Sequence, residues 1–462
     1  MIDARTRILL ETPLVPLLLR LAAPNLALML AQASTGLIET YFIGHLGTSA
    51  LAGVAVVFPG VMLIQMISGG AMGGGISASI ARALGGGRGD EANALLLHGI
   101  LINGALGLLC SIGMLACGPA LYRNLGVEGA SLRAALAYSD VIFAGSVLLW
   151  IMNALASVLR GTGNMLVPAI VICGGALLLI PVSPCLIFGF GPFPALGVSG
   201  GAWALVCYYA GGTATLSGYL WSGRSILRPR LCGVPLRWRL FRDILRVGAI
   251  ASLSSFQTNL TIMFTTGMVG TFGPGALAGF GTGSRLEYLL VPLSFGIGAP
   301  LVAVVGTNIG AGQGERAMRA AWIGAALGFC VTETIGLLAA VHPVAWLSLF
   351  DTDPAMLATG SLYLRIVGPF YGFFGLGLVL YFASQGAGRM FWPVTGQFVR
   401  LAVAVCGAAV ALRTGGGLWS VFTAIAAALL AYGATVAVSI AGGAWTGRRA
   451  PAPAVVPVRM DR

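Results

Sequence analysis

Long apolar runs, separated by short connections rich in glycine, proline and arginine, make up most of the chain. A transmembrane helix needs about 20 consecutive, predominantly apolar residues. Runs of that length occur twelve times, at 23–44, 50–81, 94–118, 135–158, 166–190, 197–221, 247–271, 276–308, 317–341, 362–384, 391–412 and 416–443. The pattern predicts an all-α polytopic membrane protein with twelve transmembrane helices, six in each half.

Three short stretches recur at an offset of 225 or 226 residues. The matching pairs are 44–53 with 270–279, 83–92 with 308–317, and 160–168 with 385–393. Because they keep their order and spacing, they indicate a duplication of about half the chain. Six crossings return the chain to its starting side, so the two copies should be parallel and pseudo-symmetric. We expect an N-terminal six-helix lobe at 1–222, a basic cytoplasmic linker at 223–246, and a C-terminal lobe with a short cytoplasmic tail at 247–462.

Composition and charge support a membrane location. Hydrophobic residues make up 57% of the chain and charged residues 9%, so lipid must cover most of the surface. All 26 basic residues are arginine, and with a cytoplasmic N-terminus only Arg123, Arg133 and Arg413 fall on the outer side. This asymmetry predicts that both termini are cytoplasmic. It also places the arginine-rich segment 223–248 against anionic lipid head groups, with no nucleic-acid partner.

The sequence lacks the residues that several functional classes require. The eight cysteines are scattered without a paired C-x-x-C motif, which predicts packing roles and no metal site. The glycine clusters are not followed by lysine, which argues against a phosphate loop. We find no embedded serine paired with histidine, no histidine cluster and no paired-aspartate signature, so no catalytic residues are expected and the protein should not be an enzyme. Asp3, Glu11 and Pro13 interrupt the first apolar run, which argues against a cleavable signal.

Glu39 is the acid of greatest interest, because a charge within the bilayer is costly unless it faces protein or water. It lies near the outer end of the first span, and Asn25, Gln32 and Thr35 precede it at helical spacing. A polar stripe on a membrane helix should face the protein interior, so we expect this span to line a hydrated cavity. The alternative is a structural carboxyl paired within its own lobe.

The second half has no acid at the position equivalent to Glu39, which is Thr265. A neutral polar face and an acid on the next span provide its candidate cleft-lining residues, which are Gln257, Thr258, Asn259, Thr265, Glu287 and Tyr288. Arg285 is a candidate charge partner in this region. Arg285 and Glu287 are two residues apart on a helix and do not face one another, so each needs another partner or water.

The chain resembles the multidrug and toxic compound extrusion (MATE) transporters. The motif-like stretches are ETYFIGHLGTSALAG (39–53), ALGGGRGDEA (83–92), RGTGNMLVP (160–168), PCLIFGFGPFPALGVSGGAWA (184–204) and the region from Ser284 to Ala317. The resemblance implies two six-helix lobes around a central cleft that opens alternately to either side. It implies a monomeric exporter of amphiphilic or cationic small molecules, driven by a proton or sodium gradient without a cofactor, in a bacterial inner membrane.

The resemblance also assigns a coupling residue. Glu39 falls where the DinF-like branch of the family commonly has its cation-coupling aspartate. Related proteins often carry Asn and Asp on the fifth span, whereas here Ser183 precedes Pro184 with only apolar neighbours upstream, and the seventh-span glutamate of the NorM-like branch is absent from 257–261. Because a proton needs only one carboxyl, the pattern favours proton coupling over sodium coupling. A lipid-linked precursor flippase is a further alternative, but it should have a more cationic cleft.

Overall fold

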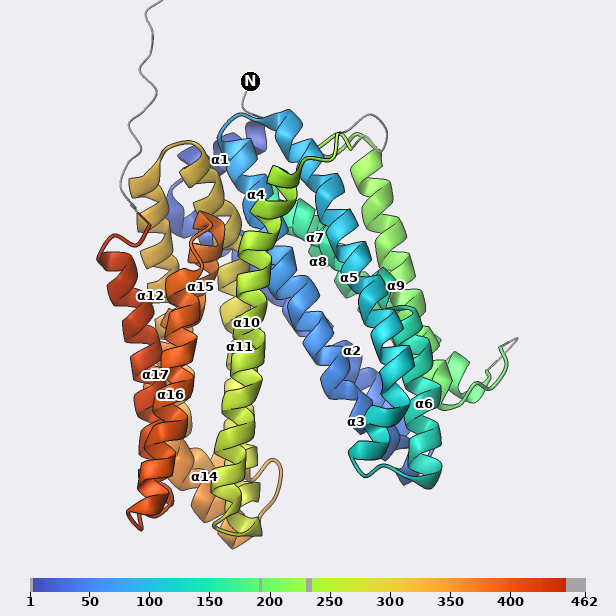
Figure 1. Cartoon of the computed structure of the whole chain (residues 1–462), viewed down its shortest axis with the longest axis vertical. Helices are drawn as coiled ribbons and strands as arrows, with labels where there is room; N and C mark the ends of the chain where they lie inside the picture. Colours follow the sequence, from blue (N-terminus) through green and yellow to red (C-terminus); the bar gives the residue numbers. More distant parts are fainter. Residues whose placement is uncertain (1–2, 191–192, 230–234, 446–462) are drawn as a thin grey trace, which may run out of the picture.

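The computed structural model describes residues 3–190, 193–229 and 235–445, which form helices and short connections (Figure 1). We call α1–α9 the N-terminal lobe. Its helices are α1 (Ala4–Glu11), α2 (Leu14–Gly44), α3 (Thr48–Gln65), the π-helix η1 (Met66–Met72), α4 (Gly73–Gly85), α5 (Gly89–Asn124), α6 (Gly129–Ala144), α7 (Ser146–Gly161), α8 (Leu166–Phe188) and α9 (Val198–Trp221).

The C-terminal lobe consists of α10–α17. Its helices are α10 (Trp238–Gly270), α11 (Pro274–Gly310), α12 (Gly314–Val341), α13 (Pro343–Leu347), α14 (Pro354–Val367), the 3-10 helix η2 (Gly368–Phe370), α15 (Tyr371–Ala387), α16 (Phe391–Arg413) and α17 (Leu418–Ala441). The two lobes have largely separate hydrophobic cores. The beginning of one long helix from each lobe packs in the core of the other lobe. Leu17 and Leu18 of α2 pack in the C-terminal core, and Leu240 and Ile244 of α10 pack in the N-terminal core.

Each apolar run predicted to span the membrane coincides with a helix or with consecutive helices. Within the described residues, nine helical segments are long and apolar enough to cross a bilayer, and the pair α6 and α7, bent by 45°, makes ten. The other two predicted spans are α9 and α10, which have the required length of 24 and 33 residues. The predicted linker at 223–246 differs from the structure at its end, because α10 already begins at Trp238.

The internal duplication is visible in the backbone. Gly47, before α3, and Gly273, before α11, have φ angles of 111° and 104°. Gly87 and Gly312, which occupy the same place within the second repeated motif, have φ angles of 71° and 76°. Residues other than glycine rarely adopt such positive angles, so the repeated motifs preserve the same chain reversals in both lobes. The lobes differ at η1, where the first copy has a π-helix and the second has continuous α-helix.

The two lobes lie close together at the end where the chain begins and diverge toward the opposite end (Figure 1). At the closed end α4 crosses α11 with glycine on both sides of the contact. A Cβ atom added to Gly85 would overlap the Thr307 carbonyl, and one added to Gly310 would overlap the Arg82 carbonyl. Such close approach of helix backbones requires small residues. We call this contact, with the adjoining parts of α10 and α15, the seam.

The orientation of the chain can be tested by thiol labelling. Cys232, which lies outside the described residues, should react with a membrane-impermeant reagent only after permeabilisation, in a variant without the other seven cysteines. A single cysteine introduced by Leu125→Cys, at a side chain 60% exposed between α5 and α6, should react in intact cells. The opposite labelling pattern would reverse the orientation that the arginine distribution predicts.

Candidate functional site

Glu39 projects from α2 into the interior of the N-terminal lobe. Its residue is 3% exposed, and its Oε1 atom has no hydrogen-bond partner among the described residues. The Tyr138 hydroxyl of α6 lies within hydrogen-bonding reach, and Tyr209 of α9 is also close. Gly201 of α9 makes room for the carboxyl, because a Cβ there would lie 3.0 Å from Oε1. The carboxyl therefore occupies a small enclosure between three helices.

No cation neutralises this carboxyl within the described part of the chain. The ion pairs found there involve Glu11, Asp243, Glu91, Glu315 and Glu287, but not Glu39. A charged carboxylate without a cation is expensive to bury, whereas a protonated carboxyl can donate a hydrogen bond and carries no charge. The enclosure therefore suits the neutral, proton-bearing form of Glu39.

The polar residues that share a face with Glu39 in the sequence do not all join it. Asn25 reaches the other lobe, where its Nδ2 donates to the carbonyls of Phe295 at 3.2 Å and Gly296 at 3.3 Å. The Thr35 hydroxyl donates to the Gln32 carbonyl at 2.7 Å, and Gln32 itself is half-buried. The expected polar stripe is thus divided, because the first half of α2 contacts α11 while its last turns enter the N-terminal lobe.

The polar side chains of α10 mostly bond to their own helix. Thr258 donates to the Ser254 carbonyl at 2.9 Å, Asn259 to the Ser255 carbonyl at 2.8 Å, and Thr265 to the Thr261 carbonyl at 2.8 Å. Such bonds satisfy hydroxyl and amide groups without a ligand. Gln257 differs, since both polar atoms of its buried amide lack a partner in the described residues. Gln257 is therefore the most available polar group on this helix.

Glu287 has a partner that the sequence did not reveal. It forms a buried ion pair with Arg400 of α16, and the Arg400 guanidinium lies 5.2 Å from the centre of the Phe374 ring. Arg285, the candidate charge partner, instead places its guanidinium 5.2 Å from the Phe350 ring centre. Tyr288 is 52% exposed. The Glu287 carboxylate is therefore neutralised within its own lobe, unlike Glu39.

We expect Glu287→Gln to destabilise the protein, because it leaves Arg400 buried without a counter-charge. Removing one partner of a buried pair typically costs about 3–5 kcal/mol. The double variant Glu287→Gln/Arg400→Met should melt at a higher temperature than the single variant. Glu315→Gln is the matched control, since its pair with Arg319 is exposed and should contribute little. If Glu287→Gln left the melting temperature unchanged and impaired only cationic substrates, Glu287 would instead be a substrate contact.

A small pocket, lined by Arg160, Gln385 and apolar side chains, lies between the lobes at η1. Arg160 of α7 donates to the Gly69 carbonyl at 3.3 Å and to the Ser157 hydroxyl at 2.7 Å, and it lies 5.9 Å from the Phe295 ring centre. From the other lobe, Gln385 of α15 donates to the carbonyls of Gly70 and Ala71. Arg160 and Gln385 line the pocket together with Phe295. Neither was a candidate in the sequence, although the 225-residue offset pairs Arg160 with Gln385.

Comparison with known proteins identifies the family. The sequence profile of the MatE family matches residues 24–185 and 251–411, one match in each lobe. The chain belongs to this family of multidrug efflux transporters. The "FAD transporter" of Shewanella oneidensis is 31% identical over 383 residues, which cover 81% of this chain and 82% of that protein. The "Probable multidrug resistance protein NorM" of Thermotoga maritima is 27% identical over 393 residues, covering 83% and 82%.

Solved structures show the same fold. A MOP superfamily transporter from Pyrococcus furiosus aligns with a TM-score of 0.86 at 23% identity, covering 96% of this chain and 98% of that one. A MATE protein in a bent conformation aligns with a TM-score of 0.87 at 23% identity, covering 96% and 97%. The predicted architecture of twelve transmembrane helices in two six-helix lobes is confirmed, as are membership of the MATE family and a transporter that is not an enzyme.

Proposed function

We propose that this MATE transporter is a proton-coupled antiporter that exports amphiphilic or cationic small molecules by alternating access. The observation that carries the proposal is the buried Glu39 carboxyl, which has no cationic partner in the described residues. Glu287, a partly buried carboxylate on the membrane helix α11, is paired with Arg400. A group that must be neutral when enclosed, and can ionise when water reaches it, is suited to carry a proton across the cycle.

The groups around Glu39 favour a proton over sodium as the coupling ion. The carboxyl has phenolic hydroxyls at Tyr138 and Tyr209 as its polar neighbours, and Gly201 contributes no side-chain oxygen. Hard cations such as calcium and magnesium take several oxygen ligands, usually including carboxylates or carbonyls, and sodium, also a hard cation, should need several as well. A proton needs only one basic oxygen. Sodium is therefore the second candidate for the driving ion.

The coupling follows from a difference between the two states of Glu39. In the protonated state the carboxyl stays enclosed between α2, α6 and α9. Ionisation makes that enclosure unfavourable, so the last turns of α2 should move to admit water. A ligand shifts a conformational equilibrium by its differential affinity for the two states, and a proton acts in the same way. Substrate binding and proton release are then linked through the position of α2.

The direction of export follows from the proposed orientation. With both termini in the cytoplasm, the closed end of the molecule faces inward and the diverging end faces outward (Figure 1). Glu39, five residues before the end of α2, then lies near the outer side. Protons would enter from that side, and substrate would leave there. We place the protein in a bacterial inner membrane and expect a single chain to suffice.

The proposal is tested with purified protein in liposomes that hold a fluorescent cationic dye. An imposed pH gradient should drive dye transport in sodium-free buffer, and collapsing the gradient should stop it. A panel of cationic, neutral and anionic dyes would define the preferred substrate class. Strict dependence on sodium, with no response to a pH gradient, would contradict proton coupling.

A second candidate substrate class is an anionic aromatic compound such as a flavin dinucleotide. One observation favours it: Arg160 is 6% exposed between the lobes, beside Phe295, and forms no ion pair within the described residues. A buried cation without a carboxylate is poised to bind an anion. The 31% identical relative named FAD transporter also supports this candidate. Flavin release into the medium, measured in cells with and without the protein, distinguishes the two classes.

A further inference from the structure

A second pocket, of about 570 Å³, opens at the seam. Its walls come from α4, α5 and their connection in the N-terminal lobe and from α10 and α11 in the C-terminal lobe. The pocket is strongly basic, with five lining arginines, which are Arg82, Arg88, Arg239, Arg242 and Arg246. Two acids, Glu91 and Asp243, also line it. The pocket is separate from the Glu39 enclosure and from the pocket at η1.

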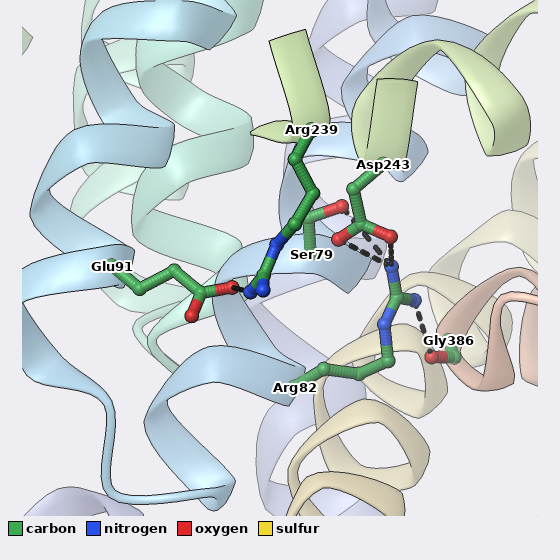
Figure 2. Close-up of polar contacts among 6 residues, drawn as sticks. All are labelled: Ser79, Arg82, Glu91, Arg239, Asp243 and Gly386. Carbon is green, nitrogen blue, oxygen red and sulfur yellow. Dashed lines mark hydrogen bonds and ion pairs between the residues drawn. The ribbon is translucent and has the colours of Figure 1, made fainter. Parts of the chain in front are cut away.

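Ion pairs join the two lobes across this pocket (Figure 2). The Arg82 guanidinium of α4 donates to the Asp243 carboxylate of α10 at 3.2 Å and to the Gly386 carbonyl of α15 at 3.0 Å. Arg239 of α10 donates to the Glu91 carboxylate of α5 at 3.0 Å. Both pairs hold the first turns of α10, whose Leu240 and Ile244 pack in the N-terminal core, against α4 and α5, and the bond from Arg82 to Gly386 reaches α15 of the C-terminal lobe. The walls of the pocket are therefore assembled by the closed seam.

The acids do not balance the arginines. Five positive and two negative side chains leave the lining with a formal charge of +3. Both acids are already engaged, Asp243 with Arg82 and Glu91 with Arg239 and Arg88. Arg242 and Arg246 are exposed on α10, about one helical turn apart, and have no ion pair or hydrogen bond from their side chains in the described residues. Two guanidinium groups are thus uncommitted on one wall of a positively charged pocket.

We propose that this pocket binds a phosphate-bearing polyanion, either a soluble one or an anionic lipid head group. A guanidinium group presents several donors in a planar fork that matches phosphate oxygens, and such charge-assisted bonds are among the stronger polar contacts. The excess of arginines on the cytoplasmic side is also expected from membrane topology. Topology alone does not require that arginines from both lobes converge on one concave site.

Ligand binding here is linked to the conformation of the transporter. The arginines lie on α4, the connection after it and the first turns of α10, whose Leu240 and Ile244 pack in the N-terminal core. Ile309 and Gly310 of α11 complete the wall from the C-terminal lobe, so the whole pocket forms only when the seam is closed. A ligand that binds one state preferentially stabilises that state. The bound polyanion therefore holds the seam closed and slows turnover. The site itself does not depend on proton coupling; only the slowing of transport rests on the proposed alternating access.

The binding experiment uses the purified full-length chain in detergent with inorganic pyrophosphate as the probe. Pyrophosphate should raise the melting temperature of the wild type in a saturable manner. Arg242→Gln/Arg246→Gln should weaken the apparent affinity at least about tenfold, because two charge-assisted contacts are lost. The matched control is Arg123→Gln/Arg413→Gln, which removes the same charge from two exposed side chains in the last turns of α5 and α16. This control should retain wild-type affinity.

Two results would overturn the site, and a third variant tests its preference for arginine. Equal weakening in the two double variants would show a response to net charge alone and would overturn the site. No saturable response in the wild type would also overturn it. Arg242→Lys/Arg246→Lys keeps the charge but loses the planar fork, so its affinity should lie between those of the wild type and the glutamine variant. An affinity as low as that of the glutamine variant would still support an arginine-specific site.

The source of the phosphate is distinguished in nanodiscs. Spin labels report the distance between the lobes when they are placed at Gly89→Cys and Gly314→Cys in a variant without the eight native cysteines. These are equivalent positions at the starts of α5 and α12, with open space around each. For a soluble ligand, pyrophosphate should favour the short distance in phosphatidylcholine. For a lipid ligand, phosphatidylglycerol should favour it without pyrophosphate. An unchanged distance under both conditions would overturn the link to seam closure.

Discussion

Glu39→Gln should reduce pH-driven export in proteoliposomes to the level of liposomes without protein, while substrate binding stays within a few fold of the wild type. The amide keeps the size of the side chain but cannot release a proton, so the linkage between protonation and the position of α2 is lost. Glu39→Asp should retain part of the transport, since it preserves the carboxyl on a shorter side chain. Transport is measured as dye movement after an imposed pH gradient, and binding by dye fluorescence in detergent.

Two controls separate coupling from folding. Glu128→Gln changes an exposed acid in the connection before α6, and it should leave both transport and binding unchanged. The melting temperature of Glu39→Gln should not fall, because a neutral amide replaces a group that is enclosed without a cation. Normal gradient-driven export by Glu39→Gln would disprove the coupling role. A large loss of stability together with lost binding would assign Glu39 a structural role instead.

Most of the fold could be predicted because it depends on local properties of the sequence. Apolar length identifies membrane helices without knowledge of their partners, since lipid itself is the solvent that each helix must match. The glycine-containing repeats were detectable for a related reason. Gly47 and Gly273 hold the same positive φ angle before α3 and α11, so few other residues are tolerated there in either copy. Architecture and pseudo-symmetry follow from these constraints.

The partners of the polar residues were not predictable in the same way. Glu287 and Arg400 are separated by 113 residues, and no periodic pattern connects them. Asn25 and Glu39 share a helical face in the sequence, but α2 leaves one lobe and enters the other between them. Helical periodicity places residues around a single helix, whereas burial and pairing depend on which helices pack against each part of it. Glu39 was identified because a membrane acid is costly wherever it lies.

The seam residues were missed for a different reason. Arg82, Arg239 and Asp243 lie near helix ends on the basic side of the chain, where the arginine distribution already explains them by topology. Only the packing of α4 against α10, α11 and α15 shows that they join the two lobes (Figure 2). Charge asymmetry thus predicts the side of the membrane on which a residue lies, but not whether it pairs across the interface between the lobes.

Gly85→Val should prevent the seam from closing and abolish transport. A Cβ at Gly85 would overlap the Thr307 carbonyl, which belongs to backbone and cannot rotate away as a side chain can. Overpacking a tight contact typically costs about 1–3 kcal/mol. In a protein that alternates between two states, that cost falls only on the closed seam, and about 1.4 kcal/mol already shifts the population tenfold. The variant should therefore favour separation of the lobes at this end over unfolding.

Spin labels at Gly89→Cys and Gly314→Cys would measure this separation. In Gly85→Val the distance between the labels should lengthen relative to the wild type, with the melting temperature changed by only a few degrees. Gly104→Val on α5 is the matched control, because a Cβ there meets no atom within 4 Å and the helix-propensity cost of valine is the same. It should show the wild-type distance and normal export. A wild-type distance in Gly85→Val, with normal export, would mean that closure of α4 on α11 is not required for the transport cycle.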